Sequence, residues 1–122
     1  MSDAELLVPK HVVEKIHELA AKILGMPTDD VIFNEIFETN YKMAAVRVVN
    51  SPEENYDEEV RIASELSKIL QVPICLGSHE QWTVDEYING KFVKELEIDD
   101  DEDETGFPII RFIDPPEGMT EP

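Results

Sequence analysis

The chain has 122 residues, one cysteine and a formal net charge of -18. This length favours a single domain, and the hydrophobic content of 42% argues against intrinsic disorder despite the charge. Phosphate backbones and anionic lipids repel so acidic a surface, and Lys and Arg are scattered singly along the chain, so direct binding to nucleic acids or membranes is disfavoured.

The sequence contains no apolar run long enough to cross a bilayer, and the N-terminus lacks the pattern of a signal peptide. A lone cysteine, Cys75, cannot form an internal disulfide. We therefore expect a cytoplasmic protein.

The first half of the chain predicts one helix and two strands. Residues 9–24 place apolar side chains at helical spacing and are followed by a Gly25 stop signal. Residues 31–50 contain two β-branched, apolar stretches around a polar turn near Asn40, which predicts a hairpin. The first stretch has an alternative, because the Thr-Asp-Asp sequence at 28–30 also suits the start of a short helix.

A second helix is predicted by its start signals. Ser51 suits the N-cap, Pro52 the first turn and Glu54 the capping box. We expect this helix to reach about residue 70. Its predicted buried face is Tyr56, Val60, Ala63, Leu66 and Leu70.

The second half predicts strands. Residues 72–79 suit a strand buried on both faces, and Asn89-Gly90 is the preferred pair for a two-residue hairpin turn. Residues 107–113 suit a last strand, and residues 115–122 form a polar, Pro-rich tail that we expect to be poorly ordered. The predicted hairpin register pairs Tyr87 with Phe92, Asp85 with Lys94 and Thr83 with Leu96.

Together these elements predict an α+β fold, with two helices packed on one face of a mostly antiparallel sheet of about five or six strands. A single domain would span residues 1–114, followed by the flexible tail 115–122.

Residue clusters with catalytic potential are few. Cys75, Ser78 and His79 are close in sequence, but neighbouring strand positions point to opposite faces, so they do not predict a catalytic triad. His11 and His17 lie on different faces of the first helix, and His17 beside glutamates is typical of a solvated surface. We therefore expect no catalytic residues and no cofactor.

The acidic segment also resembles half of a calcium site. Asp101, Asp103, Thr105 and Gly106 are spaced like the first half of an EF-hand loop, but the twelfth position is Phe112, where a glutamate is needed. The sequence thus predicts no dedicated metal site, while weak association with divalent ions stays open.

The strongest functional signal is charge. Seven carboxylates occupy the eight positions 97–104, and the rest of the chain is acidic as well. A broad negative field accelerates association with a basic partner. The simpler alternative is that the charge only keeps the protein soluble.

We therefore expect a non-enzymatic, acidic binding protein that neutralises a basic protein partner such as a nuclease, in the manner of an immunity protein, an antitoxin or a DNA mimic. Trp and Tyr concentrate binding energy at interfaces. The candidate binding residues are Glu97, Asp99, Asp100, Asp101, Glu102, Asp103, Glu104, Trp82, Tyr87 and Tyr56. The alternative is a small structural or regulatory subunit that forms a homo-oligomer through an apolar sheet face.

Overall fold

The computed structural model describes residues 2–51, 56–77 and 82–118. Seven strands and two α-helices make up the described chain, with two short 3-10 turns beside the first helix. The helical elements are η1 (Lys10–Val12), α1 (Val13–Leu24), η2 (Thr28–Asp30) and α2 (Tyr56–Leu70). The strands are β1 (Ser2–Pro9), β2 (Ile32–Thr39), β3 (Met43–Ser51), β4 (Ile74–Gly77), β5 (Thr83–Ile88), β6 (Lys91–Glu102) and β7 (Pro108–Phe112).

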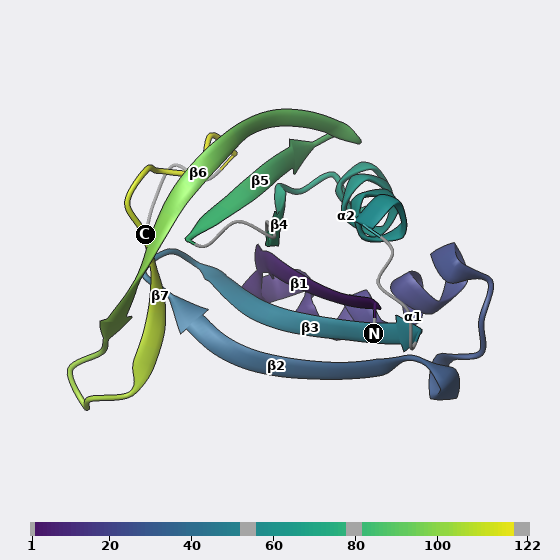
Figure 1. The fold of residues 1–122 in the computed structure, drawn as a ribbon, viewed down its shortest axis with the longest axis horizontal. Helices are drawn as coiled ribbons and strands as arrows, with labels where there is room; N and C mark the ends of the chain where they lie inside the picture. Colours follow the sequence, from purple (N-terminus) through teal and green to yellow (C-terminus); the bar gives the residue numbers. More distant parts are fainter. Residues whose placement is uncertain (1, 52–55, 78–81, 119–122) are drawn as a thin grey trace.

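The strands form a closed barrel in the order β1-β3-β2-β7-β6-β5-β4, and β4 pairs back onto β1 (Figure 1). The ladders are antiparallel except for the short parallel contact between β2 and β7. The prediction of two helices on a sheet of about five or six strands is therefore wrong, because seven strands close into a barrel.

Closure depends on β1, which the sequence analysis did not predict. Residues of β1 pair with β3 along one edge and with β4 along the other. Irregularities in β2 beside Phe37 and in the β5–β6 ladder beside Glu86 add bend and twist to the strands. Bends of this kind are the usual way in which a sheet curls far enough to meet its own edge.

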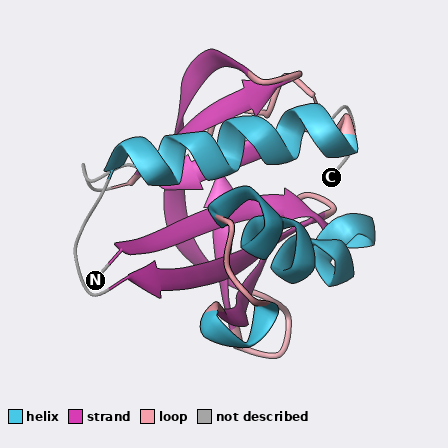
Figure 2. Ribbon diagram, turned by 90° about the vertical axis from the view of Figure 1, so that its right-hand side faces the viewer, coloured by secondary structure: helices cyan, strands magenta, loops and turns pink. Residues whose placement is uncertain are grey.

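Both helices lie on the same side of the strands (Figure 2). Their apolar side chains, including Ile16, Ile62 and Leu66, pack on the outward residues of β1, β3 and β4 to form the larger core cluster. The predicted helix over residues 9–24 is confirmed from Val13 to its end at Leu24, with Gly25 in the left-handed region at φ 68° as its C-cap. Its predicted start is wrong, because Pro9 ends β1 and Lys10–Val12 form a 3-10 turn. Among the described residues, no helix is long and apolar enough to cross a membrane.

The second predicted helix is confirmed to its end at Leu70, but its start signals at 52–54 lie outside the described residues. Ala63 and Leu66 are buried as predicted. Tyr56 is not, because it lies in the first turn and keeps 39% of its surface exposed.

The barrel interior holds a second, smaller cluster. Leu7, Cys75, Val84, Leu96 and Phe112 meet there from five strands. These apolar side chains occupy the middle of the barrel.

The β5–β6 hairpin is confirmed, and its turn has the expected positive φ values at Asn89 (53°) and Gly90 (80°). The register is confirmed only next to this turn, where Tyr87 faces Phe92. Beyond Glu86 a bulge shifts the pairing by one residue, so Asp85 faces Glu95 and Thr83 faces Glu97. The predicted Asp85–Lys94 and Thr83–Leu96 pairs are wrong for that reason.

The segment after β7 folds back onto the barrel as far as residue 118. Pro116 is buried, and the backbone N–H groups of Glu117 and Gly118 bind the carboxylate of Glu86. Residues 119–122 of the expected tail lie outside the described residues.

Candidate binding cleft at the barrel mouth

The acidic run is part of a regular hairpin. β6 continues to Glu102 and pairs with β7, with Asp99 opposite Arg111 and Asp100 opposite Ile110. All the residues from Asp99 to Glu104 are exposed. The end of this hairpin projects from the barrel at the lower left of Figure 1.

Opposite-facing side chains divide the run into two sets, since neighbouring strand residues point to opposite faces. On the outer face, the Arg111 guanidinium lies 3.6 Å from Asp99 and 3.4 Å from Asp101. On the inner face, Asp100 lies at the lip of a cleft. Arg111 thus offsets part of the charge of Asp99 and Asp101, whereas Asp100 faces the cleft.

The turn that ends the run is organised by Asp103. Its Oδ1 accepts hydrogen bonds from the Thr105 backbone N–H at 2.8 Å, the Thr105 hydroxyl at 2.6 Å and the Phe107 N–H at 3.0 Å. The Thr105 hydroxyl bond, helped by these N–H groups, holds the pKa of Asp103 below its ordinary value. The Asp103 carboxylate therefore stabilises the turn, and its Oδ1 is already hydrogen-bonded within it.

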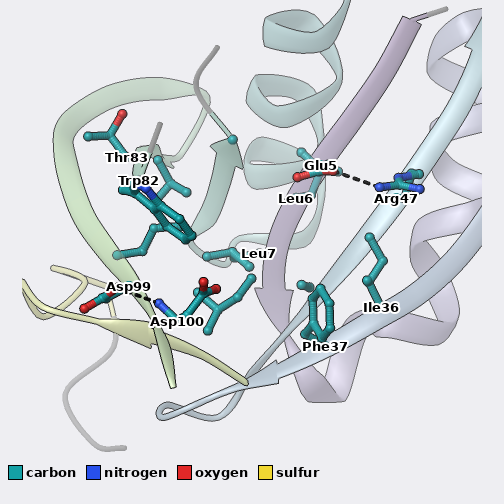
Figure 3. Close-up of a pocket in the computed structure, with 15 residues that line it drawn as sticks. Glu5, Leu6, Leu7, Ile36, Phe37, Arg47, Trp82, Thr83, Asp99 and Asp100 are labelled. Carbon is teal, nitrogen blue, oxygen red and sulfur yellow. Dashed lines mark hydrogen bonds and ion pairs between the residues drawn. The ribbon is translucent and has the colours of Figure 1, made fainter. Parts of the chain in front are cut away.

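The cleft is about 360 Å³ in volume and lies at the end of the barrel beside β6 (Figure 3). Its floor is apolar and belongs partly to the inner core cluster, with Leu7, Ala45, Val84, Ile98 and Ile110. This size is within the range of roughly 300–1,000 Å³ that is typical of small-ligand sites.

Two aromatic side chains line the cleft. Trp82 lies on the side of Asp100, and Phe37 lies across from them (Figure 3). Trp82 is 50% exposed and Phe37 is 41% exposed. The backbone of Trp82 has a φ of 68° and its carbonyl accepts the Ile98 N–H at 2.9 Å, so the strand β6 holds this residue in place.

The polar groups of the cleft carry a negative balance. The Arg47 guanidinium donates to the Glu5 carboxylate at 3.0 Å, so these two charges offset one another. Asp99 and Asp100 also line the cleft, and among the described residues that line it Arg47 is the only basic one. Because Arg111 offsets part of the charge of Asp99, the negative balance of the cleft comes mainly from Asp100, which repels an anion and attracts a cation.

The ten predicted binding residues do not form one site. The cleft brings together Trp82, Asp99 and Asp100. Tyr87 is 7% exposed and belongs to the core beneath the helices. Tyr56 lies on α2, where its hydroxyl donates to Asp85 Oδ2 at 3.2 Å.

Twelve of the fifteen residues that line the cleft were not among the predicted ones, including Glu5, Phe37 and Arg47. Glu5 and Arg47 meet because β1 pairs with β3, and no local signal in the sequence announces that pairing. Phe37 follows the irregularity in β2, which turns a large apolar side chain towards solvent. The adjacent apolar pair Ile36-Phe37, which breaks the alternation of apolar and polar residues, is the sequence signal that could have identified it.

The residues weighed for catalysis or metal binding are engaged elsewhere. Cys75 is fully buried, and burial raises the pKa of its thiol, with Glu86 and Asp85 adding to the effect. His17 Nε2 donates to the backbone carbonyls of Thr28 at 3.0 Å and Val31 at 2.6 Å. Ser78 and His79 lie outside the described residues.

Within the described part of the chain, no three His, Cys, Asp or Glu side chains converge in a way that could hold a metal ion. This includes the residues of the half EF-hand pattern, where Asp103 and Thr105 bind each other across the turn.

No protein-family model matches the chain, and neither does any curated protein or solved structure.

Proposed function

We propose that this protein is a non-enzymatic binding protein that neutralises a basic macromolecular partner. One observation carries the proposal: the acidic run lies on a hairpin paired with β7, exposed from Asp99 to Glu104, and it forms the lip of a cleft that contains the half-exposed Trp82. Such a surface combines a charged rim with an aromatic anchor, which is the usual composition of a protein interface.

The net charge of -18 adds long-range attraction to these local contacts. A field of this size raises the rate of encounter with a basic partner and weakens as salt is added. The same field opposes binding to nucleic acid, so a nucleic-acid-binding protein such as a nuclease is a more suitable partner than its substrate.

The spacing of the run also suits a partner that normally binds DNA. A strand advances about 3.3 Å per residue, and one strand of B-DNA carries a phosphate about every 3.4 Å along its axis. Carboxylates follow one another without interruption along β6 from Asp99 to Glu102. These carboxylates alternate between the two exposed faces of the hairpin. The match between carboxylate and phosphate spacing therefore applies to a partner that surrounds the projecting hairpin, as a toxin or nuclease would surround a DNA mimic.

We propose a cytoplasmic location, in which a buried cysteine and no disulfide are expected.

The test compares two charge-reversal variants in a pull-down from a lysate of the source cells. In the run variant, Glu97, Glu102 and Glu104 are changed to Lys; in the control variant, the exposed helix residues Glu14, Glu18 and Glu65 are changed to Lys. Both variants change the net charge equally. We expect a basic protein to be retained at low salt and released at high salt, to be lost by the run variant and to be kept by the control variant.

The proposal is wrong if no basic protein is retained, or if both triple variants retain the same partner equally well. Circular dichroism melts of the three proteins verify that the comparison concerns folded molecules.

Self-association is the second candidate, and one observation favours it. A groove of about 690 Å³ on the outside of the barrel is lined by Phe37, Phe107 and Ile109, and Phe107 is 70% exposed. The closed barrel removes the flat apolar sheet face on which this candidate was first based. Sedimentation velocity separates the candidates, because a dimer held by apolar burial persists at high salt and is lost on Phe107→Ser.

A further inference from the structure

We infer that the cleft at the barrel mouth binds an arginine side chain presented by the basic partner. The inference depends on the proposed function for the source of that side chain and assigns the cleft as the specific contact. Its basis is the combination of an apolar floor, aromatic walls and carboxylates at the lip (Figure 3).

Charge selects a cation. Glu5 and Arg47 offset one another at 3.0 Å, and two further carboxylates, Asp99 and Asp100, line the same cleft. Asp99 is also shared with Arg111 on the outer face at 3.6 Å. Asp100 has its carboxylate on the cleft side of the strand, so it is the group best placed to meet an incoming positive charge.

Shape and surface select arginine among cations. The guanidinium is planar and weakly hydrated, stacks on aromatic faces and offers a fork of donors to a carboxylate, whereas an ammonium group is a compact, strongly hydrated charge. Trp82 and Asp100 lie on the same side of the cleft and provide a ring face and a carboxylate together. The apolar stem of the arginine would cover the partly exposed Ile98 and Ile110 on the floor.

Cation–π contact and a charge-assisted hydrogen bond are both stronger where water is partly excluded. The floor contributes to that exclusion, because its side chains, among them Ile98 and Ile110, are apolar and offer water no hydrogen-bond partner. An arginine on the open hairpin would have no such shelter.

The test uses the only tryptophan of the chain, Trp82, as a fluorescent reporter of the cleft. Three capped tripeptides are titrated into the intact protein: Gly-Arg-Gly, Gly-Lys-Gly and Gly-citrulline-Gly. Citrulline keeps the shape of arginine without its charge. We expect saturable quenching by the arginine peptide, at least fivefold weaker binding of the lysine peptide and no saturation with citrulline.

Two matched variants separate the cleft from the general field. Asp100→Asn removes a charge at the lip, and Glu95→Gln removes a charge from the same strand, outside both the cleft and the acidic run. Both positions are exposed, so the fold should persist. We expect Asp100→Asn to weaken binding of the arginine peptide at least fivefold and Glu95→Gln to change it less than twofold.

The inference is overturned if citrulline binds as well as arginine, or if the two variants weaken binding equally. These outcomes are distinct from failure of the proposed function. A partner that is lost by the run variant but retained by Asp100→Asn and Trp82→Ala would support the proposed function and overturn the assignment of the cleft as the arginine site. Arginine-selective binding in the titration, without any partner in the pull-down, would support the cleft assignment and overturn the proposed function.

Discussion

The fully buried carboxylate of Glu86 accepts the backbone N–H of Glu117 at 2.9 Å. Its second oxygen accepts the N–H of Gly118 at 3.0 Å. Glu86 lies opposite Cys75 on the β4–β5 ladder, whereas Gly77 and Val84 at the other end of this ladder line the cleft. One end of the barrel is therefore covered by the C-terminal segment, and the other end is open.

The first prediction concerns the two hydrogen bonds that the Glu86 carboxylate accepts from the C-terminal segment. Glu86→Gln keeps the shape but replaces one acceptor oxygen with an NH₂ group that faces a backbone donor. Because hydrogen bonds to buried charged groups are the stronger ones, we expect a loss of about 2 kcal/mol in the free energy of unfolding. Urea denaturation measures it. Glu95→Gln, an exposed position on the adjacent strand, is the control and should change stability little.

Hydrogen exchange adds a local measurement. The amides of Glu117 and Gly118 should exchange faster in Glu86→Gln, while amides in α2 keep their rates. Unchanged exchange at these two amides would show that their hydrogen bonds to Glu86 are not formed in solution.

The second prediction concerns Cys75. Because the side chain is fully buried and its thiol pKa is raised by burial, the native protein should not react with iodoacetamide at neutral pH. Complete reaction is expected in denaturant. Mass spectrometry of both samples checks this, and rapid labelling of the folded protein would reopen an enzymatic role for this residue.

The third prediction is a loss of stability in alkali. Burial and the neighbouring Asp85 raise the pKa of Tyr56 from 10.0 to about 12. A group whose pKa is higher in the folded state stabilises the fold fully below its unfolded pKa and loses this effect as the pH rises through the folded pKa. The contribution of Tyr56 should thus be complete below pH 10 and disappear towards pH 12.

Thermal melts between pH 8 and pH 12 measure this dependence. Tyr56→Phe removes both the titrating group and its hydrogen bond to Asp85, so the variant should be less stable near neutrality and should lose less stability in alkali. Tyr87 and Cys75 also have raised pKa values, so the variant should still lose some stability as the pH rises. Parallel curves for the variant and the wild type would contradict the prediction.

Local signals in the sequence predicted the elements that depend on neighbouring residues. The stop at Gly25 and the turn at Asn89-Gly90 are examples, because each position requires a positive φ that few residues adopt easily. The ends of both helices, at Leu24 and Leu70, follow from the spacing of their apolar residues.

Contacts distant in sequence were not predictable in the same way. The bulge beside Glu86 moves Val84 into register with Leu96, and the backbone donors that bind the buried Glu86 belong to the C-terminal segment. Nothing near residue 86 announces either contact. The closed barrel and the Glu5–Arg47 pair likewise require β1 to lie between β3 and β4, which is a property of the whole fold.

The final prediction concerns the order of the acidic hairpin. Asp103 is the acceptor for two backbone N–H groups and one hydroxyl in the turn, so Asp103→Ala should speed the amide exchange of Thr105 and Phe107 several-fold. Glu104→Ala removes an equal charge from the same turn and should leave these rates unchanged. Since the pKa of Asp103 is lowered, its effect is present above the ordinary carboxyl range and is lost as the pH falls through the folded pKa. Acid should therefore loosen the turn in the wild type but not in Asp103→Ala, and equal acid responses would mean that another group holds the hairpin together.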